Sequence, residues 1–472
     1  MDAENIMRIE PLKAPLDGAA TVPGDKSISH RAVLFSAMAE GTSRLTGVLD
    51  SADVRSSIDV VTALGAKVNL EVGVDGSLSG GITGWGAEGP KQPDHPLDCG
   101  NSGTTARLLM GVVAPWPIKV EITGDESLKK RPMRRVIAPL MKMGVHFEPE
   151  AQENLPITEI GNPNLKAITY DAPMASAQLK TAVLLAGLGA EGETRVNEPA
   201  LSRNHTELML PEFGVDATSA YRSAMVQGPA TLKASEIDVP GDPSSAAFLI
   251  CAALLKRGSS IQVENVSLNA GRIGFVRTLE RMGASIEVRH MGQEGREAYG
   301  IIEATYTPRL TGCEIPKQHI ASVIDEIPVL ALVAAHAHGR TVFRQGSELT
   351  KKESNRLDAI IEGLGLLGVD AWCENDDLFI DGQPNLVVPQ GLTFDSRKDH
   401  RLAMTWSLVG LCGNTPVNIV DFDSVKVSFP QLLESFERLA EVGGTKRVES
   451  CFILDSMPLN RQNTLVAQCV HR

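Results

Sequence analysis

A repeated pattern of apolar and polar positions runs along the whole chain. Six short segments, such as VTALGAKVNL and LERMGASIEV, carry apolar residues at helical spacing, then a glycine, then a strand-like stretch. A glycine in this position typically ends a helix in the left-handed conformation. The glycines are Gly65, Gly144, Gly214, Gly283, Gly368 and Gly443, at intervals of 69 to 85 residues. This near-constant interval predicts six copies of one folding unit.

A second helix is predicted ahead of each of these segments, and it is apolar nearly all round. SSAAFLICAALLKRG and EIPVLALVAAHAHG are two examples. A helix without a polar face is buried on every side. A β-rich stretch such as IKVEIT follows each buried helix. Each unit is therefore expected to contain a buried helix, a strand, an exposed helix, a glycine and a strand, which makes the fold α/β.

Six units divide into two domains of three, and a further repeat locates the division. VPGDKS at 22–27 and VPGDPSS at 239–245 each lead into a buried helix, so we place the crossovers between the domains there. We expect the N-terminal segment MRIEPLK to be a strand that folds back onto the second domain. The first predicted domain covers residues 24–238 with units one to three. The second covers 1–23 plus 239–448 with units four to six, and 449–472 form a tail of unknown role.

Composition narrows the functional classes. The 472 residues carry 45 Lys and Arg against 58 Asp and Glu, a net charge of −13, and only 4% are aromatic. So acidic a chain with few stacking rings is a poor nucleic-acid binder. The seven cysteines form no CxxC pair, which fits a reducing compartment. No apolar signal segment begins the chain, and its longest apolar runs cover about half a bilayer. We expect a soluble cytoplasmic protein that binds neither nucleic acid nor membrane.

Several of the buried helices begin with polar and cationic residues. Lys26, Ser27 and Arg31 lie at the start of the first, and Gly103 lies at the start of the second. Helix starts attract anions, because their N–H groups are unpaired and the dipole is positive there. Similar residues in other units are Ser176, Gln178 and Arg401 at buried helices, and Arg131, Arg203, Lys352 and Arg356 at exposed ones. Any one of these is most often a solvated charge or a cap, but their recurrence predicts an interdomain site for a small, multiply anionic ligand.

Two carboxylates stand among these cations. Asp325 opens the fifth buried helix, and Glu353 lies between Lys352 and Arg356. An aspartate at a helix start is commonly a cap, and a glutamate beside a lysine commonly forms a surface pair. Among phosphate-binding cations, carboxylates also suit proton transfer on a phosphorylated substrate. Asp325 and Glu353 are therefore candidate catalytic residues. The catalytic interpretation and the structural one, a helix cap or a surface ion pair, have equal weight.

Other catalytic motifs are not found. His336 and His338 are two residues apart and do not share a helical face on which to hold a metal ion. The chain contains neither a GxxxxGK[ST] phosphate loop nor a GxSxG nucleophile elbow. Nucleotide-driven and serine-hydrolase chemistry are therefore disfavoured, and no metal site is expected.

Several motifs together closely resemble the 3-phosphoshikimate 1-carboxyvinyltransferase family, also called 5-enolpyruvylshikimate-3-phosphate (EPSP) synthase. They include PGDKSISHRA, DCGNSGTTAR, PMASAQLKTAVLLAGL, SRNHTE, DEIPVLA, KKESNR and DHRLAM, and the resemblance covers about residues 8–445. ASAQLK and KKES are most similar to the bacterial branch described as glyphosate-tolerant. The resemblance implies two inside-out α/β domains, each of three repeated βαβαββ-like units, around a hinged interdomain cleft.

The resemblance implies transfer of the enolpyruvyl group of phosphoenolpyruvate to the 5-hydroxyl of 3-phosphoshikimate, in the shikimate pathway of aromatic amino-acid biosynthesis, without metal or organic cofactor. Asp325 resembles the base at the 5-hydroxyl, and Glu353 the residue that handles protons at the methylene carbon. Lys26, a third candidate catalytic residue, resembles the lysine that touches both substrates, and Gln178 would lie between them. The residues that resemble shikimate-phosphate contacts are Ser27, Arg31, Ser176, Arg203 and Lys352. Those that resemble the phosphoenolpyruvate cradle are Gly103, Arg131, Arg356 and Arg401.

Two other functions are weighed against this one. The related UDP-N-acetylglucosamine enolpyruvyl transferase usually has Lys-Asn where this chain has Lys26-Ser27, and a loop cysteine where it has GDESLKKRP. A non-catalytic six-unit scaffold that binds polyanions would explain the repeats but not the two carboxylates. The chain also departs from its family: Asn355 replaces a common aspartate, Thr350 a frequent arginine, and Val427 a lysine for which Lys426 is an uncertain substitute. We expect a monomer with small-molecule partners.

Gly103 sets an expectation of its own. Some members of the tolerant branch carry an alanine at this position, whose methyl group would crowd glyphosate more than phosphoenolpyruvate. This chain has the glycine. We therefore predict measurable sensitivity to glyphosate despite the branch-like motifs.

Overall fold

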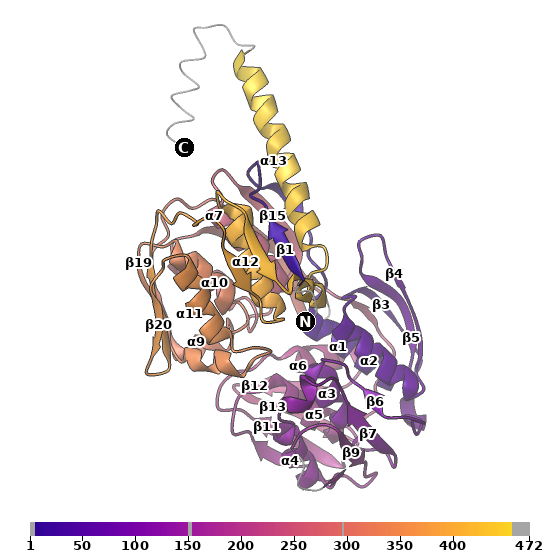
Figure 1. Ribbon diagram of the computed structural model, residues 1–472. Helices are drawn as coiled ribbons and strands as arrows, with labels where there is room; N and C mark the ends of the chain where they lie inside the picture. Colours follow the sequence, from indigo (N-terminus) through magenta and orange to yellow (C-terminus); the bar gives the residue numbers. More distant parts are fainter. Residues whose placement is uncertain (1–4, 150–152, 295–296, 456–472) are drawn as a thin grey trace.

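The fold consists of six similar α/β units, drawn in Figure 1. The computed structural model describes residues 5–149, 153–294 and 297–455. Within these residues the strands form five sheets of four strands and one sheet of three.

Units one to three contain most of the first half of the chain. Unit one has β14 (Glu236–Asp238), α1 (Lys26–Met38), β3 (Thr42–Val48), α2 (Ala52–Ala63), β4 (Lys67–Val72) and β5 (Leu78–Thr83). Unit two has β6 (Leu97–Asp98), α3 (Gly103–Val113), β7 (Lys119–Thr123), α4 (Arg134–Met143), β8 (His146–Glu148) and β9 (Ile157–Ile160). Unit three has β10 (Thr169–Asp171), α5 (Ala177–Gly187), β11 (Gly192–Asn197), α6 (His205–Met209), β12 (Ala217–Ala220) and β13 (Ser223–Gly228).

Units four to six contain the remainder. Unit four has β2 (Asp17–Ala20), α7 (Pro243–Leu255), β15 (Ser260–Ser267), α8 (Gly274–Arg281), β16 (Ser285–Glu294) and β17 (Glu297–Thr305). Unit five has β18 (Glu314–Ile315), α9 (Lys317–Ile320), α10 (Ile327–Ala335), β19 (Gly339–Phe343), α11 (Arg356–Leu366), β20 (Ala371–Glu374) and β21 (Asp377–Gly382). Unit six has β1 (Ile6–Ile9), β22 (Thr393–Asp395), α12 (His400–Cys412), β23 (Val417–Val420) and α13 (Leu432–Asp455). Short 3₁₀ helices are η1 (Gly86–Glu88), η2 (Leu128–Lys130), η3 (Leu210–Phe213), η4 (Gly346–Lys351) and η5 (Phe422–Val427).

Every four-stranded sheet has the same topology. In unit three, β10 runs parallel to β11, which pairs antiparallel with β13, and β13 pairs antiparallel with β12. The parallel pair is joined by the buried helix α5, as a parallel crossover requires. The other units repeat this order, so the predicted α/β fold of repeated βαβαββ units is confirmed.

The first strand of two units comes from a distant part of the chain. β14 follows unit three but pairs with β3 of unit one, and β2 precedes unit one but pairs with β15 of unit four. The connecting segments run side by side: Asp25 N donates to Pro240 O at 2.8 Å, and Asp242 N donates to Pro23 O at 2.8 Å. Both segments therefore pass together between the two groups of units.

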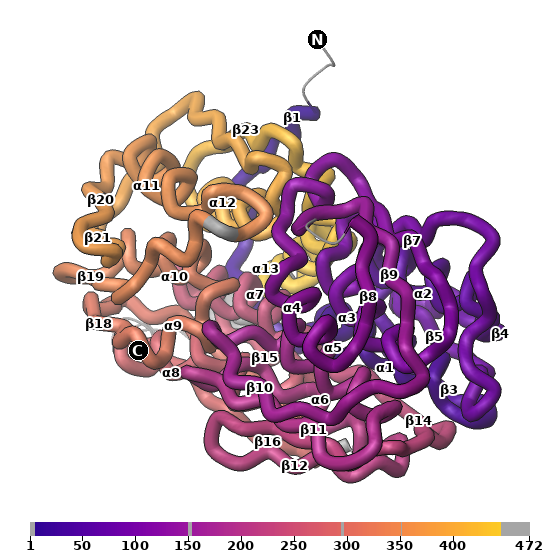
Figure 2. The backbone as a smooth tube through the Cα atoms, turned by 90° about the horizontal axis from the view of Figure 1, so that it is seen from below, coloured from indigo at the N-terminus to yellow at the C-terminus, as the bar shows by residue number. Residues whose placement is uncertain are grey.

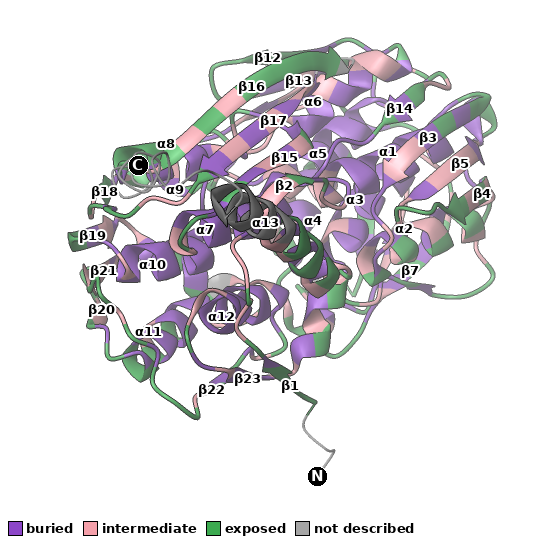
Figure 3. Cartoon of the chain, turned by 90° about the horizontal axis from the view of Figure 1, so that it is seen from above, coloured by how far each residue is buried: buried purple, intermediate pink, exposed green. Residues whose placement is uncertain are grey.

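The buried helices form the centre of each group of units. All residues of α10 are buried, as are those of α7 up to Leu254, and both are purple in Figure 3. The apolar core falls into two clusters, one with residues between Ile28 and Val239 and one with residues 9–20 and 246–439. Figure 2 shows units one and two on one side of the molecule and units five and six on the other.

The glycine pattern is correct in five units and wrong in the sixth. Five marker glycines have φ between +75° and +108° after the exposed helix of their unit. Gly443 does not, because α13 continues through it to Asp455. Its Cα faces the segment before β2, and an added Cβ would lie 2.1 Å from Pro15 O. This glycine therefore permits a close backbone approach and ends no helix.

The two ends of the chain both contribute to unit six, and the C-terminal end is a helix where a strand and a tail were expected. Unit six gains its third strand from the N-terminus, because β1 pairs antiparallel with β23. The expectation that MRIEPLK folds back is confirmed. Residues 449–455 of the predicted tail belong to α13, and 456–472 lie outside the described residues.

Candidate active site

Asp325 is the centre of a cluster of cations from both groups of units. It lies in the turn before α10, with its side chain 14% exposed. Arg203 Nη2 contacts its Oδ2, and Lys352 Nζ and Arg356 Nη1 lie 3.3 and 3.2 Å from Oδ1. Arg401 Nη2 lies 3.9 Å from Oδ2. Burial alone would raise the pKa of Asp325, but these four cations hold it well below its usual range, so the carboxylate is ionised.

Arg356 opens α11 and is fully buried among three carboxylates. Its Nη2 donates to Glu353 at 2.6 Å, its Nε to Asp399 at 2.8 Å and its Nη1 to Asp325 at 3.2 Å. Its side chain is 0% exposed. Sequence reasoning assigned no role to Asp399. The only signal was its position ahead of His400 and Arg401 at a helix start.

Glu353 is ionised in this arrangement. Its side chain is 39% exposed, and partial burial raises its pKa, but the Arg356 guanidinium lowers it far below the usual range. His400 itself is neutral at physiological pH, because burial and the charge of Arg401 lower its pKa to about 4. Because Glu353 carries no proton at neutral pH while Arg356 remains its partner, it cannot act as an acid in this arrangement.

Lys26 opens α1 and pairs with Asp53 of α2. Its backbone N–H donates to Asp242 Oδ2 at 3.1 Å, so a residue of the second group of units holds the start of this helix. The cation of Lys26 lowers the pKa of Asp53 against the effect of burial. Asp242 in turn accepts from Ser244 N at 2.8 Å, and the Ser244 hydroxyl contacts Glu326, the residue after Asp325. Asp53 gave no signal in the sequence.

Arg31 of α1 is buried against two helices of unit three, α5 and α6. It is 3% exposed, and its guanidinium donates to Thr206 and Thr181 at 2.8 Å each. Its Nη1 donates to Ser27 O at 3.0 Å. Burial lowers the pKa of Arg31 to about 10. In this structure Arg31 supports the half-buried Ser27 through its carbonyl.

A second cationic cluster surrounds Gln178. Its Oε1 accepts from Arg107 Nη1 and Arg135 Nη2, both at 3.0 Å, and its Nε2 donates to Thr104 Oγ1 at 3.0 Å. Arg107 also donates to Gly103 O at 3.3 Å. The sequence pointed to Gln178 and Gly103, but gave no role to Arg107 and no signal for Arg135.

The second cluster carries an excess of positive charge. Arg131 donates to the Asn101 side chain at 2.6 Å and to Ser127 at 3.2 Å. In the part of the chain that the structure describes, neither Arg107, Arg131 nor Arg135 forms an ion pair. Burial, Arg135 and Arg131 lower the pKa of Arg107 to about 9. Guanidinium groups without counterions favour a phosphate or carboxylate ligand.

Ser176 and Arg203 lie on neighbouring loops of unit three. Ser176 caps α5, because its hydroxyl accepts from Leu179 N at 3.3 Å. Arg203 lies between β11 and α6 and reaches Asp325 in the other group of units. Arg203, Lys352, Arg356, Arg401, Glu353 and Asp325 are thus brought together, whereas Gly103, Arg131 and Gln178 form the separate second cluster.

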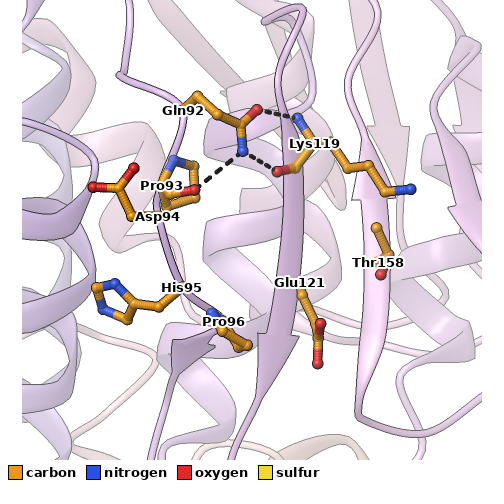
Figure 4. A pocket seen from close by; sticks show the side chains of 8 residues that line it. All are labelled: Gln92, Pro93, Asp94, His95, Pro96, Lys119, Glu121 and Thr158. Atoms are coloured by element: carbon orange, nitrogen blue, oxygen red, sulfur yellow. Dashed lines mark hydrogen bonds between the residues drawn. The ribbon is translucent and has the colours of Figure 1, made fainter.

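A surface hollow of about 410 Å³ lies away from both clusters. Gln92, Pro93, Asp94, His95, Pro96, Lys119, Glu121 and Thr158 line it (Figure 4). The described ranges hold no group of three or more His, Cys, Asp or Glu placed to bind a metal ion. Within the same ranges, no helix combines the length and apolar character needed to span a membrane.

Two solved structures have the same architecture as this chain. The enolpyruvyl transferase NikO from Streptomyces tendae shares the fold with a TM-score of 0.73 at 19% identity, covering 92% of this chain and 97% of that one. EPSP synthase from Acinetobacter baumannii is more similar, with a TM-score of 0.82 and 37% identity over 93% of this chain and 98% of that one.

Sequence comparison identifies the family. The EPSP synthase (3-phosphoshikimate 1-carboxyvinyltransferase) family model matches residues 12–436. The 3-phosphoshikimate 1-carboxyvinyltransferase of Shouchella clausii is 40% identical over 92% of this chain and 99% of its own length. That of Halorhodospira halophila is 43% identical over 93% and 97%. The chain belongs to the EPSP synthase family.

Proposed function

We propose that this protein transfers the enolpyruvyl group of phosphoenolpyruvate to the 5-hydroxyl of 3-phosphoshikimate and releases phosphate. The observation that carries this proposal is Asp325, an ionised carboxylate with cations from both groups of units around it. A multiply anionic substrate would pair with these cations, which raises the pKa of Asp325 and allows the carboxylate to act as a base. Membership of the EPSP synthase family supports the same reaction.

Two ligand subsites follow from the two clusters. For phosphoenolpyruvate, we propose that Gly103 and Arg131 hold the phosphate and that Arg356 and Arg401 hold the carboxylate. For 3-phosphoshikimate, the proposed contacts are Ser27, Arg31, Ser176, Arg203, Lys352 and Asp325. Lys26 and Gln178 would touch both ligands. Arg31 already donates to Thr181, Thr206 and Ser27, which leaves two of its five N–H groups for the ligand.

The chemistry needs one proton added to the methylene carbon and later removed from it, and the proton of the 5-hydroxyl removed. Glu353 delivers a proton to the methylene carbon of phosphoenolpyruvate, which leaves cationic character at C2. The 5-hydroxyl adds to C2 as Asp325 takes its proton, and a tetrahedral adduct forms. The methyl group of the adduct then returns a proton to Glu353, the C–O bond to phosphate breaks, and the proton held by Asp325 leaves with the phosphate, which gives the enol ether product. Bound cations stabilise the phosphate that leaves.

Ligand binding would make Glu353 able to donate its proton. In the structure Arg356 pairs with Glu353, Asp399 and Asp325. A ligand carboxylate that takes the Nη2 donor of Arg356 removes the partner of Glu353. The pKa of Glu353 then rises, because Arg356 is the cation that lowers it most. The acid is thus prepared only when phosphoenolpyruvate is present.

The remaining parts of the proposal concern the whole molecule. We propose domains at 24–238 and at 1–23 plus 239–448, which close around both ligands. The two core clusters support this division. We further propose a cytoplasmic monomer whose partners are its two substrates, without nucleic acid or membrane.

Phosphate release tests the function directly. The purified protein should release phosphate with phosphoenolpyruvate plus 3-phosphoshikimate and with neither alone. Release with UDP-N-acetylglucosamine instead would favour the related transferase, and no release with either acceptor would favour a scaffold. Glu353→Gln and Asp325→Asn should each lower turnover by about 10²- to 10⁴-fold, the usual share of acid–base catalysis. Near-normal turnover in both variants would remove the proposed site.

A further inference from the structure

Two of the proposed contacts for 3-phosphoshikimate lie on adjacent loops. Ser176 precedes α5, after strand β10, and Arg203 precedes α6, after strand β11. Because β10 and β11 are parallel, both loops leave the same edge of the sheet. The distance between the hydroxyl and the guanidinium therefore depends on what connects these two loops.

Glu198 connects the two loops through one carboxylate. Its Oε1 accepts from the backbone N–H of Ser176 at 3.0 Å. Its Oε2 accepts from the Ser202 hydroxyl at 2.9 Å, one residue before Arg203. Glu198 is 7% exposed, so water offers it little alternative. A shift of this carboxylate would move both loops.

Lys180 holds Glu198 in place from the second turn of α5. Its Nζ lies 2.9 Å from Glu198 Oε2 and 2.8 Å from Glu207 Oε1. The lysine is 3% exposed. Burying an ammonium is costly unless it is paired, and here it is paired twice. This lysine is not among the proposed ligand contacts.

Lys180 is the cation that pairs with both carboxylates, Glu198 and Glu207. Arg31 is a second cation near Glu207. The charge of Glu207 raises the pKa of Arg31, against the larger effect of burial, which lowers it. Neither oxygen of Glu207 accepts a well-aligned hydrogen bond within the described residues. The second carboxylate is therefore held by charge, and removal of Lys180 would leave two buried carboxylates opposite one arginine.

We propose that Lys180 is a positioning residue for 3-phosphoshikimate. Through Glu198 it sets the spacing between Ser176 and Arg203 and does not touch the ligand itself. This role rests on the proposed function, because it concerns the binding of that substrate. Without the ammonium, the Glu198 carboxylate takes up a proton or turns toward solvent, and both loops lose their common anchor.

Steady-state kinetics of Lys180→Met test the proposal, because methionine keeps the length of the side chain without its charge. We expect the KM for 3-phosphoshikimate to rise at least ~10-fold, which corresponds to about 1.4 kcal/mol. The KM for phosphoenolpyruvate should change less than ~2-fold and kcat less than ~3-fold. Glu198→Gln should have the same effect, and the double variant should add little to either single one.

Lys256→Met is the matched control. Lys256 is a partly buried lysine whose Nζ donates to Leu12 O at 2.8 Å, far from unit three in the chain. This variant should lower the melting temperature and leave both KM values unchanged. It separates a loss of buried lysine contacts from a loss of loop position.

Three results would overturn the role of Lys180. The first is an unchanged KM for 3-phosphoshikimate in folded Lys180→Met, and the second is an equal rise of both KM values. If circular dichroism shows that Lys180→Met does not fold, Glu198→Gln decides, and an unchanged KM there is the third. A wild type that releases no phosphate overturns the proposed function itself, whereas an active wild type with unaltered variants overturns only the positioning role.

Discussion

Gly103→Ala would press a methyl group against the Arg107 guanidinium. The added carbon would lie 2.6 Å from Arg107 Nη1 and 3.6 Å from Leu128 Cδ1. Ordinary contact begins at 3.4 Å, so Nη1 has to retreat by about 0.8 Å. The family resemblance places this methyl group against the ligand, whereas the structure places it first against Arg107.

The size of the effect follows from the bonds that Arg107 makes. Its Nη1 donates to Gln178 at 3.0 Å and to Gly103 O at 3.3 Å. A retreat of about 0.8 Å is enough to break either bond, because hydrogen bonds longer than about 3.5 Å contribute little. A hydrogen bond to a charged group contributes about 1.5–3 kcal/mol. We therefore expect the KM for phosphoenolpyruvate to rise about 10-fold and the inhibition constant of glyphosate to rise by at least that factor.

The assay is a set of inhibition curves at matched substrate saturation for wild type, Gly103→Ala, Arg107→Ala and the double variant. If the methyl group acts through Arg107, Gly103→Ala should change either constant less than ~2-fold in the Arg107→Ala background. Gly365→Ala is the control, because an added Cβ there meets no atom within 4 Å. A higher inhibition constant with an unchanged KM would refute this reasoning and indicate a direct clash with glyphosate. A wild type that ignores millimolar glyphosate would show that other residues determine tolerance.

Three further predictions concern stability and closure. Arg356→Lys should lower the free energy of unfolding by about 3–5 kcal/mol, because lysine cannot pair with three carboxylates at once and leaves the fully buried Asp399 without its cation; a loss under about 1 kcal/mol in denaturant titration would contradict the pairing. Burial raises the pKa of Glu159 well above its usual value, so the stability that its protonated form contributes is lost as pH rises through the folded-state pKa. Wild type should therefore lose more stability than Glu159→Gln between pH 6 and pH 9, and equal slopes in chemical denaturation would contradict this. Solution scattering should show a smaller radius of gyration with 3-phosphoshikimate plus glyphosate, and an unchanged radius at saturation would count against a hinged cleft.

Local patterns in the sequence were sufficient to predict the repeated unit. Apolar periodicity and a glycine after a helix depend on neighbours within one or two turns, so they can be read without the rest of the chain. The same local pattern failed at Gly443. There the glycine is needed because Pro15 O approaches α13, and that approach joins parts of the chain more than 400 residues apart.

The cationic side of the site was also predicted from the sequence, because helix starts and charged residues are visible in one dimension. Only the tertiary structure decided which charge meets which. Asp399 pairs with Arg356 across 43 positions, and Arg203 reaches Asp325 across 122. Burial and the approach of distant segments determine these pairs, and no spacing rule describes them. The sequence therefore determined the units, the fold class and the candidate anion-binding residues. The packing of the six units determined which of those residues form ion pairs, which already donate hydrogen bonds within the protein, and which are left without a counterion.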